Sequence, residues 1–144
     1  MINLDRELHS MINLVEKMVN EKSQKIDRLE AQRAKFWNNV AGPSILNLNN
    51  AINKLEDRSG YLEPHRSDEP IRILRVKNEN LGVEWEFSFR IKTTREDLNL
   101  WVELGEGGKK YSIEEIDEDK IYKEFIEQYK TKLLRNYMID YRDE

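Results

Sequence analysis

Residues that could do chemistry are sparse in this chain, and the histidines come first because they could bind a metal. The only histidines are His9 and His65. Asp5 and His9 lie four residues apart, a spacing that on a helix presents two ligands on one face. Three carboxylates lie close to His65 in the sequence: Glu63, Asp68 and Glu69. A structural zinc site takes about four ligands, usually Cys or His, so we expect solvated polar residues at both places, with no metal and no cofactor.

Nucleophiles and phosphate-binding loops are equally incomplete. The chain has no cysteine, which excludes disulfides, thiolate catalysis and zinc–thiolate sites. Ser10 follows His9 directly, and successive residues of a helix do not face each other. The segment 105–110 (GEGGKK) has the glycines and lysines of a phosphate-binding loop, but it lacks a Ser or Thr after the lysine and precedes a short strand rather than a helix. We expect a hairpin turn there.

Acidic residues cluster between positions 114 and 119, where five of the six side chains are carboxylates. Paired carboxylates do acid–base chemistry when they are buried and differ in environment. Acidic residues are also ordinary in the first turn of a helix, where they stabilise the helix dipole. We favour a helix start at this place and keep a bound cation or a basic partner as the alternative.

Basic residues gather on the polar half of the first predicted helix: Lys22, Lys25, Arg28, Arg33 and Lys35. Neighbouring acids offset this charge, and the whole chain carries a net charge of −4. Such a face is typical of a solvated helix, and phosphate contacts to a nucleic acid are the alternative. Because no global basic field attracts nucleic acid or acidic membranes, the composition disfavours both as partners.

Three aromatic residues could anchor a protein partner. Trp101 falls on the polar face of a predicted strand, where it forms a cation–π pair with Arg90, is covered by the first helix, or contacts another protein. That face also holds the carboxylates of Glu84, Glu86 and Glu103, which disfavour a base-stacking platform. Phe36 and Trp37 are either core anchors where the first helix meets the domain or part of an interface. The candidate partner surface is therefore Arg90, Trp101, Phe36 and Trp37.

A predicted β-hairpin organises the elements that position these residues. Residues 83–91 and 98–104 alternate apolar and polar side chains with a period of two, which predicts two half-buried antiparallel strands. The turn falls near 94–97. We expect Ile91 opposite Leu100, because a two-residue slip would set two like charges against each other, those of Glu86 and Glu103.

The strand before this hairpin, residues 71–77, has an ambiguous pattern, since Ile71 and Ile73 or Leu74 and Val76 could face the core. Setting Val76 opposite Trp85 aligns residues of opposite charge: Lys77 with Glu84 and Arg75 with Glu86. We prefer this register. A short edge strand within 109–113 completes a three- or four-stranded antiparallel meander.

Residues 3–40 contain neither Gly nor Pro and predict a long amphipathic helix. At 1.5 Å per residue it would be about 54 Å long, whereas a compact chain of this length is roughly 37 Å across. Part of the helix should therefore protrude, bend, or pack on something outside its own domain. The matching heptad positions become Lys and Gln after Met18, which favours a packed helix or a short coiled coil over a long zipper. The candidate self-association residues are Leu4, Leu8, Met11, Val15 and Met18.

Gly42-Pro43-Ser44 predicts the end of this helix, followed by a short helix from about 45 to 58 with Gly60 as its C-cap. The two would form a helical hairpin or one sharply kinked helix. A polar connector, 63–70, leads to the sheet, and a C-terminal helix over about 117–137 would cover its apolar face.

The predicted fold class is α+β: a long N-terminal helix and a short second helix, a three- to four-stranded antiparallel β-meander, and a C-terminal helix packed on one sheet face. We expect residues 1–60 to form the helical part, which is also the candidate self-association element. Residues 61–144 would form the sheet with its helix, and the first part would dock on the second as one compact domain.

Composition bounds the function of this 144-residue chain, which suffices for one ordinary domain. Hydrophobic residues make up only 38%, a fraction that suits an elongated shape. No stretch reaches the roughly 20 apolar residues of a membrane span, and the start lacks an apolar signal segment, so we expect a cytoplasmic protein without membrane association. We expect a non-enzymatic protein-interaction and assembly module that forms a homo-oligomer, with a dimer favoured, and/or binds another protein. The alternatives are a binding module for nucleic acid or another anionic ligand, and a carboxylate- or metal-dependent enzyme.

Overall fold

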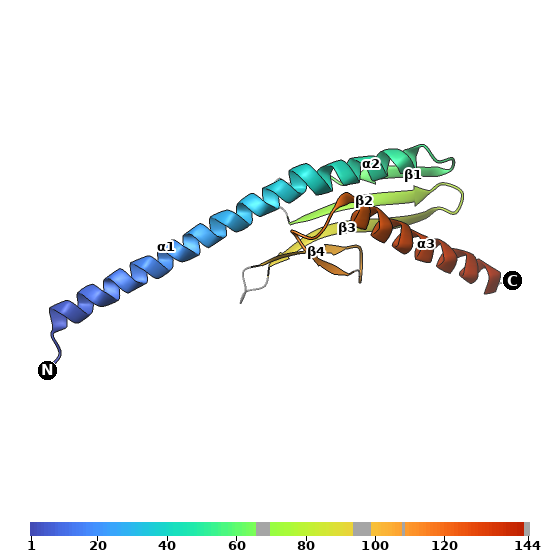
Figure 1. Ribbon diagram of the computed structural model, residues 1–144. Coiled ribbons are helices and arrows are strands. Elements are labelled where there is room, and N and C mark those ends of the chain that lie inside the picture. Colours follow the sequence, from blue (N-terminus) through green and yellow to red (C-terminus); the bar gives the residue numbers. More distant parts are fainter. Residues whose placement is uncertain (66–69, 94–98, 108, 143–144) are drawn as a thin grey trace.

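The computed structural model combines a long helical rod, a five-stranded antiparallel sheet and a C-terminal helix (Figure 1). It describes residues 1–65, 70–93, 99–107 and 109–142, with side chains up to residue 136. The helices are α1 (Leu4–Phe36), the π-helical turn η1 (Trp37–Ala41), α2 (Gly42–Asn53) and α3 (Glu118–Arg142). The strands follow one another across the sheet as β1 (Arg58–Leu62), β2 (Ile71–Asn78), β3 (Val83–Thr93), β4 (Leu100–Leu104) and β5 (Lys110–Ser112). The predicted α+β class is confirmed, with five strands in place of three or four.

The helix does not break at Gly42-Pro43, so the predicted helical hairpin is wrong. α1 continues through η1 into α2, and one rod extends from Leu4 to Asn53 (Figure 1). In an α-helix a proline removes one N–H donor and its ring meets the carbonyl four residues earlier; the wider π turn relieves this conflict. The Gly42 N–H donates to the Trp37 carbonyl, five residues back, and Ser44 Oγ donates to the Val40 carbonyl at 2.6 Å. These hydrogen bonds allow the helix to continue through Gly42 and Pro43, residues that ordinarily end a helix.

The π turn also sets the direction of the buried side chains. At 3.6 residues per turn, an uninterrupted α-helix would place the apolar positions of α2 roughly 130–150° away from Leu29 and Phe36. A π turn takes up one extra residue, which turns the following helix back by about 100°. The end of α1 and the whole of α2 therefore face the same core, which contains Phe36, Trp37, Ala41, Ile45, Leu48 and Ile52.

The β2–β3 register agrees with the prediction from charge pairing. Val76 lies opposite Trp85, and Lys77 lies opposite Glu84. Leu74 and Val76 are 0% and 1% exposed, so they are the strand's core side chains. The favourable cross-strand charge pairs identified the correct register where the hydrophobic pattern alone did not.

The β3–β4 register differs from the prediction by two residues. Ile91 lies opposite Val102 rather than Leu100. The shift keeps the same side chains on the apolar face, because the side-chain period of a strand is two. It also brings Lys92 Nζ to 2.6 Å from the Glu103 carboxylate. The observed register is neither of the two weighed from the sequence, and it is the one in which the Lys92–Glu103 ion pair forms. The predicted turn near 94–97 lies outside the described residues.

β1 is absent from the sequence prediction, which gives residues 45–58 to a helix and makes Gly60 its C-cap. α2 ends at Asn53, and β1 crosses the predicted boundary at residue 60. The Gly60 N–H donates to Asn53 Oδ1 at 2.7 Å, and a β-carbon at Gly60 would collide with the Asn49 side chain. The glycine therefore permits a close approach of β1 to α2 rather than ending a helix. Residues 66–69 of the predicted connector lie outside the described residues.

α2 and α3 lie side by side on one face of the sheet, α2 over β1 and β2 and α3 over β3 and β4 (Figure 1). The Asn47 side chain donates to the Tyr122 hydroxyl at 3.0 Å and joins the two helices. The C-terminal helix on the apolar face is thus as predicted, and an Asp117 carboxylate oxygen, which accepts from the Lys120 N–H at 2.9 Å, caps its start.

Aromatic side chains fill the space between α3 and the sheet. Ring centroids in this cluster lie 5.1–5.8 Å apart, which is the range of stabilising aromatic pairs. The members are Trp85, Phe87, Phe125 and Tyr129. This cluster holds α3 on β3. The N-terminal part of α1 contributes no residue to the core.

Candidate interaction surface

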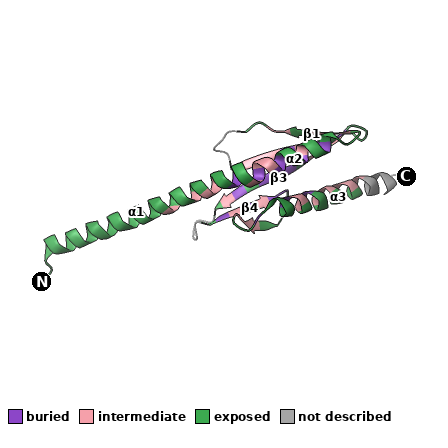
Figure 2. Ribbon diagram, turned by 45° about the horizontal axis from the view of Figure 1, so that its top comes forward, coloured by how far each residue is buried: buried purple, intermediate pink, exposed green. Residues whose placement is uncertain are grey.

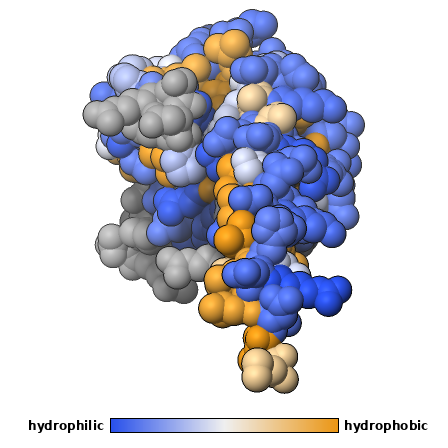
Figure 3. Space-filling model, turned by 90° about the vertical axis from the view of Figure 1, so that its left-hand side faces the viewer, coloured by the Kyte–Doolittle hydropathy of each residue, from blue (hydrophilic) through white to orange (hydrophobic). Residues whose placement is uncertain are grey.

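The N-terminal part of α1 projects from the domain, and residues 1–24, which we call the arm, are exposed throughout (Figures 1 and 2). Asn3 caps the helix by accepting from the Arg6 N–H at 3.3 Å. Eight large apolar side chains form what we call the arm stripe. They are 46–66% exposed: Leu4, Leu8, Met11, Ile12, Leu14, Val15, Met18 and Val19. Figure 3 shows apolar residues following one another along the arm. The predicted protrusion is confirmed.

The arm stripe faces the same side of the helix as the folded domain. Leu8, Val15, Leu29 and Phe36 lie at multiples of seven residues from one another, so they drift by only about 20° for each seven residues of a straight helix. Phe36 is 3% exposed and Leu29 packs against the core. The exposed stripe therefore continues along the helix into the buried core, which begins at Leu29, where the sheet and α3 (together called the sheet domain) pack against the rod.

Charge changes along this side of the helix in a regular order. The first turn carries Asp5 and Glu7. The arm stripe follows, and the next two positions in its heptad rows are Lys22 and Lys25. After these two cations, the contacts with the sheet domain begin. Read from the N-terminus, the face is acidic, apolar and cationic before it becomes part of the core.

The sheet face opposite the helices is open and carries ion pairs. Arg75 on β2 contacts three carboxylates: Glu86 at 2.8 Å, Glu63 at 3.1 Å and Glu84 at 3.9 Å. The hydrogen bond that the Arg75 guanidinium donates to the Glu63 carboxylate is the main cause that raises the pKa of Arg75. Because three carboxylates surround the Arg75 guanidinium, this cation is not available to bind a phosphate group.

A second ion pair, Lys92–Glu103, lies on the same open face between β3 and β4. The hydrogen bond from Lys92 is the main cause that lowers the pKa of Glu103, and desolvation opposes it. Arg90 lies opposite Glu103 and Trp101 lies opposite Lys92. Trp101 therefore has Lys92, not Arg90, as its cross-strand neighbour. Trp101 is half-buried and Arg90 is exposed, and both remain on the face predicted for them.

Phe36 and Trp37 belong to the core, which was the first of the two alternatives for them. Phe36 is 3% exposed and Trp37 is 9% exposed. Their rings contact each other at 5.3 Å, and the Arg72 guanidinium lies 4.5 Å from the centroid of Trp37. They anchor the rod to the sheet, so neither side chain is accessible to a partner in this chain.

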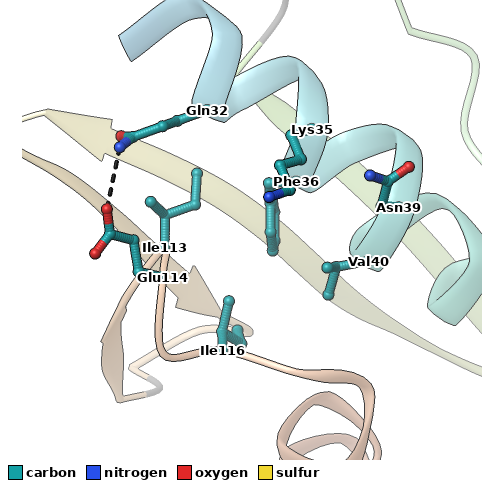
Figure 4. Close-up of a pocket in the computed structure, with 8 residues that line it drawn as sticks. All are labelled: Gln32, Lys35, Phe36, Asn39, Val40, Ile113, Glu114 and Ile116. Atoms are coloured by element: carbon teal, nitrogen blue, oxygen red, sulfur yellow. Dashed lines mark hydrogen bonds between the residues drawn. The ribbon is translucent and has the colours of Figure 1, made fainter. Parts of the chain in front are cut away.

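A recess of about 380 Å³ lies where α1 and η1 pass over the connection from β5 to α3 (Figure 4). Across its rim, Gln32 Nε2 donates to a carboxylate oxygen of Glu114 at 3.1 Å. Glu114 and Lys35 are the two charged side chains among the lining residues, and the others provide no histidine or hydroxyl. The apolar lining consists of Phe36, Val40, Ile113 and Ile116. This lining can hold an apolar side chain.

The remaining chemistry-bearing residues are dispersed. His9 and His65 are exposed, and within the described ranges no three His, Cys, Asp or Glu side chains gather as a metal site. Asp68 and Glu69, near His65 in the sequence, lie outside the described residues. Of the acidic cluster, Glu114 bonds Gln32 and Asp117 caps α3. The glycine-rich segment connects β4 to β5, in line with the predicted hairpin turn.

The five candidate self-association residues all belong to the arm stripe, which also contains Ile12, Leu14 and Val19. All three were visible as apolar residues, but they fall outside the two strict heptad rows. Among the helices in the described part of the chain, none is long and apolar enough to cross a membrane. No protein-family model, curated protein or solved structure matches this chain.

Proposed function

We propose that this chain is a non-enzymatic assembly module that self-associates through the arm stripe, with a dimer as the favoured state. One observation carries the proposal: a continuous apolar face lies on a helix that projects from its own domain. A surface helix normally buries such a face, and within the described part of the chain nothing covers it. A second copy supplies a surface of the same kind.

The size of the arm stripe supports this role. The exposed apolar area of the arm stripe can be estimated from about 30 Å² of surface per methylene-sized group. Because its eight side chains are about half exposed, the stripe presents roughly 500 Å² of apolar surface per copy. Two copies together would bury about 1,000 Å², which is near the lower bound of specific interfaces. Exposed apolar patches of a few hundred square ångströms mark interaction sites.

The other two functions find less support among the described residues. An enzyme needs several convergent acid, base or nucleophilic groups, and the recess beside Phe36 is lined by only two charged side chains, Lys35 and Glu114. A binding site for phosphate needs accessible cations without competing acids. Arg75 and Lys92 already contact carboxylates, and the basic residues of α1 are interleaved in the sequence with Glu21, Asp27 and Glu30. The exposed stripe needs only an apolar partner surface.

The experiment is light scattering on a sizing column, with protein loaded over a wide concentration range. We expect twice the mass of the 17.3 kDa chain. The double variant Leu8→Glu/Val15→Glu should be a monomer, because two carboxylates would be buried in the apolar contact. The matched control, Asn13→Glu/Asn20→Glu, adds the same charge to the opposite side of the arm and should remain a dimer. A wild-type monomer at every concentration would end the proposal.

A further inference from the structure

We infer that two arms pair in antiparallel orientation, each along the arm stripe of a second copy, so that the two sheet domains stand at opposite ends of the paired helices. This inference rests on the proposed self-association and adds to it an orientation and a register. Three observations carry it: the side of the helix on which the domain stands, the order of charges along the stripe, and the positions of the apolar residues that flank it.

The position of the domain excludes a parallel, in-register pair. In such a pair the second helix lies along the stripe side for its whole length. That side is occupied from Leu29 onward, where Leu29 and Phe36 pack on the chain's own core. Because both copies would place their domains across the same two-fold axis, the two sheets would compete for one space. Reversing one helix moves each domain beyond the other copy's N-terminus.

The charges along the stripe also favour the antiparallel pair. A parallel pair sets Lys22 against Lys22 and Lys25 against Lys25 of the second copy, which is repulsive. In the antiparallel pair these two lysines meet the N-terminal turn of the second copy, which carries Asp5 and Glu7. Opposite charges then meet at both ends of the interface. The lysine stems can cover apolar surface there while their ammonium groups stay in water.

The register follows from the apolar residues. In an antiparallel coiled coil, one heptad row faces the other row of the second helix. The alignment centred on residue 13 places Leu8 opposite Met18 and Met11 opposite Val15 of the second copy, so its four central layers are all apolar. Ile12 and Leu14, outside the strict rows, would each meet their own counterpart beside the centre. This explains why these flanking positions are apolar and exposed in a single chain.

Neighbouring registers are less favourable. A shift of seven residues toward a shorter overlap leaves Val19 uncovered, and Val19 is 63% exposed. A shift of seven toward a longer overlap sets Lys22 and Lys25 against Met11 and Leu8. The chosen register keeps a lysine opposite an apolar residue only in its two end layers, where Lys22 meets Leu4. It also brings Glu7 near Glu21 at the solvated edge, and Lys25, four residues from Glu21, offsets that repulsion.

Because the chain has no cysteine, single cysteines can report the orientation. The experiment uses the full chain with Leu8→Cys on one tagged batch and Met18→Cys on another, mixed and mildly oxidised, with disulfides counted on a non-reducing gel. We expect the mixed disulfide to form at least about tenfold faster than either homodisulfide. Antiparallel Leu8 positions would lie about 15 Å apart along the axis, and a disulfide needs Cα atoms within about 7 Å.

The controls separate this inference from the proposed function. Asn13→Cys mixed with Asn20→Cys, on the opposite side of the arm, gives the yield from random collision. Rapid Leu8→Cys homodisulfides would show a parallel pair and overturn the orientation while self-association stands. A dimer by light scattering whose mixed disulfide stays at the control rate would overturn the register. A monomer by light scattering would remove both claims at once.

Discussion

Gly42 is the residue on which the continuous rod depends. In an ordinary helix interior, replacing Gly by Ala stabilises the helix by about 1 kcal/mol. Here a β-carbon would lie 2.7 Å from the Trp37 carbonyl oxygen in the π turn. We therefore expect Gly42→Ala to lower the free energy of unfolding by about 1–3 kcal/mol, the usual cost of overpacking. Urea unfolding measures this change.

The control for Gly42 is Asn50→Ala, at an exposed position of α2. It should change the free energy of unfolding by less than about 0.5 kcal/mol. If Gly42→Ala instead stabilised the protein as it does in regular helices, the π turn would not be the feature that accommodates Pro43.

The pair Lys92–Glu103 gives the sheet a pH-dependent contribution to stability. Hydrogen bonding to Lys92 lowers the pKa of Glu103 in the folded protein. The folded state therefore binds a proton less readily than the unfolded state, and the contribution is present above the ordinary pKa of glutamate and is lost as the pH falls through the lowered value. We expect Glu103→Gln to cost about 0.5 kcal/mol at neutral pH, since the pair is partly solvated, and almost nothing at pH 3.

Urea unfolding of the wild type and the variant at both pH values tests this sign. Glu106→Gln, at an exposed position of the turn between β4 and β5, is the matched control and should show no such difference. An equal cost of Glu103→Gln at pH 7 and pH 3 would mean that the carboxylate charge is irrelevant and that only packing was disturbed.

Among the elements, those with a strict period were predictable and those shaped by contacts were not. β3 and β4 alternate over their length, and α3 carries a helical stripe, so each was found with its buried face. β1 has no alternation, and its strand state comes from pairing with β2 and from the approach to Asn49 and Asn53. The helix across Pro43 depends on one π turn, for which the sequence gives no signal.

In the arm, too, the spacing of residues predicted which side chains form the apolar row, but not which of them are buried. Heptad spacing indicated Leu4, Leu8, Met11, Val15 and Met18. Spacing could not show that Phe36, in the same row as Leu8, would be buried while Leu8 stays 46% exposed. That difference arises only where the sheet stands on the helix, which is a property of the tertiary structure.

The helical state of the arm should depend on association. An isolated helix of this length is marginally stable in water, and most helices gain their stability from packing. We expect the amides of residues 8–20 to exchange hydrogen for deuterium several-fold more slowly at high than at low protein concentration, because pairing buries the arm stripe. Mass spectrometry of peptides from the arm measures this effect.

Two internal comparisons accompany the exchange experiment. Peptides from β3 should show no concentration dependence, since that strand lies within the folded domain. The Leu8→Glu/Val15→Glu variant should exchange rapidly in the arm at all concentrations. Arm amides that are equally protected at every concentration in this variant would show that the helix is stable without a partner.

At the scale of the whole molecule, the projecting rod makes the protein elongated, and the arm stripe lies at the end of the rod that is remote from the sheet (Figure 1). Antiparallel pairing places the two Leu29 residues, where the domains begin, about 50 Å apart. A parallel pair would bring the domains together beside one axis. Small-angle X-ray scattering distinguishes these arrangements, because two separated masses produce a second maximum in the distribution of interatomic distances.

We expect that second maximum at or beyond about 50 Å for the wild-type dimer. The Leu8→Glu/Val15→Glu monomer should show a single maximum with a long tail from its own arm. Asn13→Glu/Asn20→Glu should reproduce the wild-type curve, because its added charges lie away from the stripe. A dimer with one maximum at short distance would place the two sheets in contact, and the contact between copies would then have to involve the open sheet face with Trp101 rather than the arm alone.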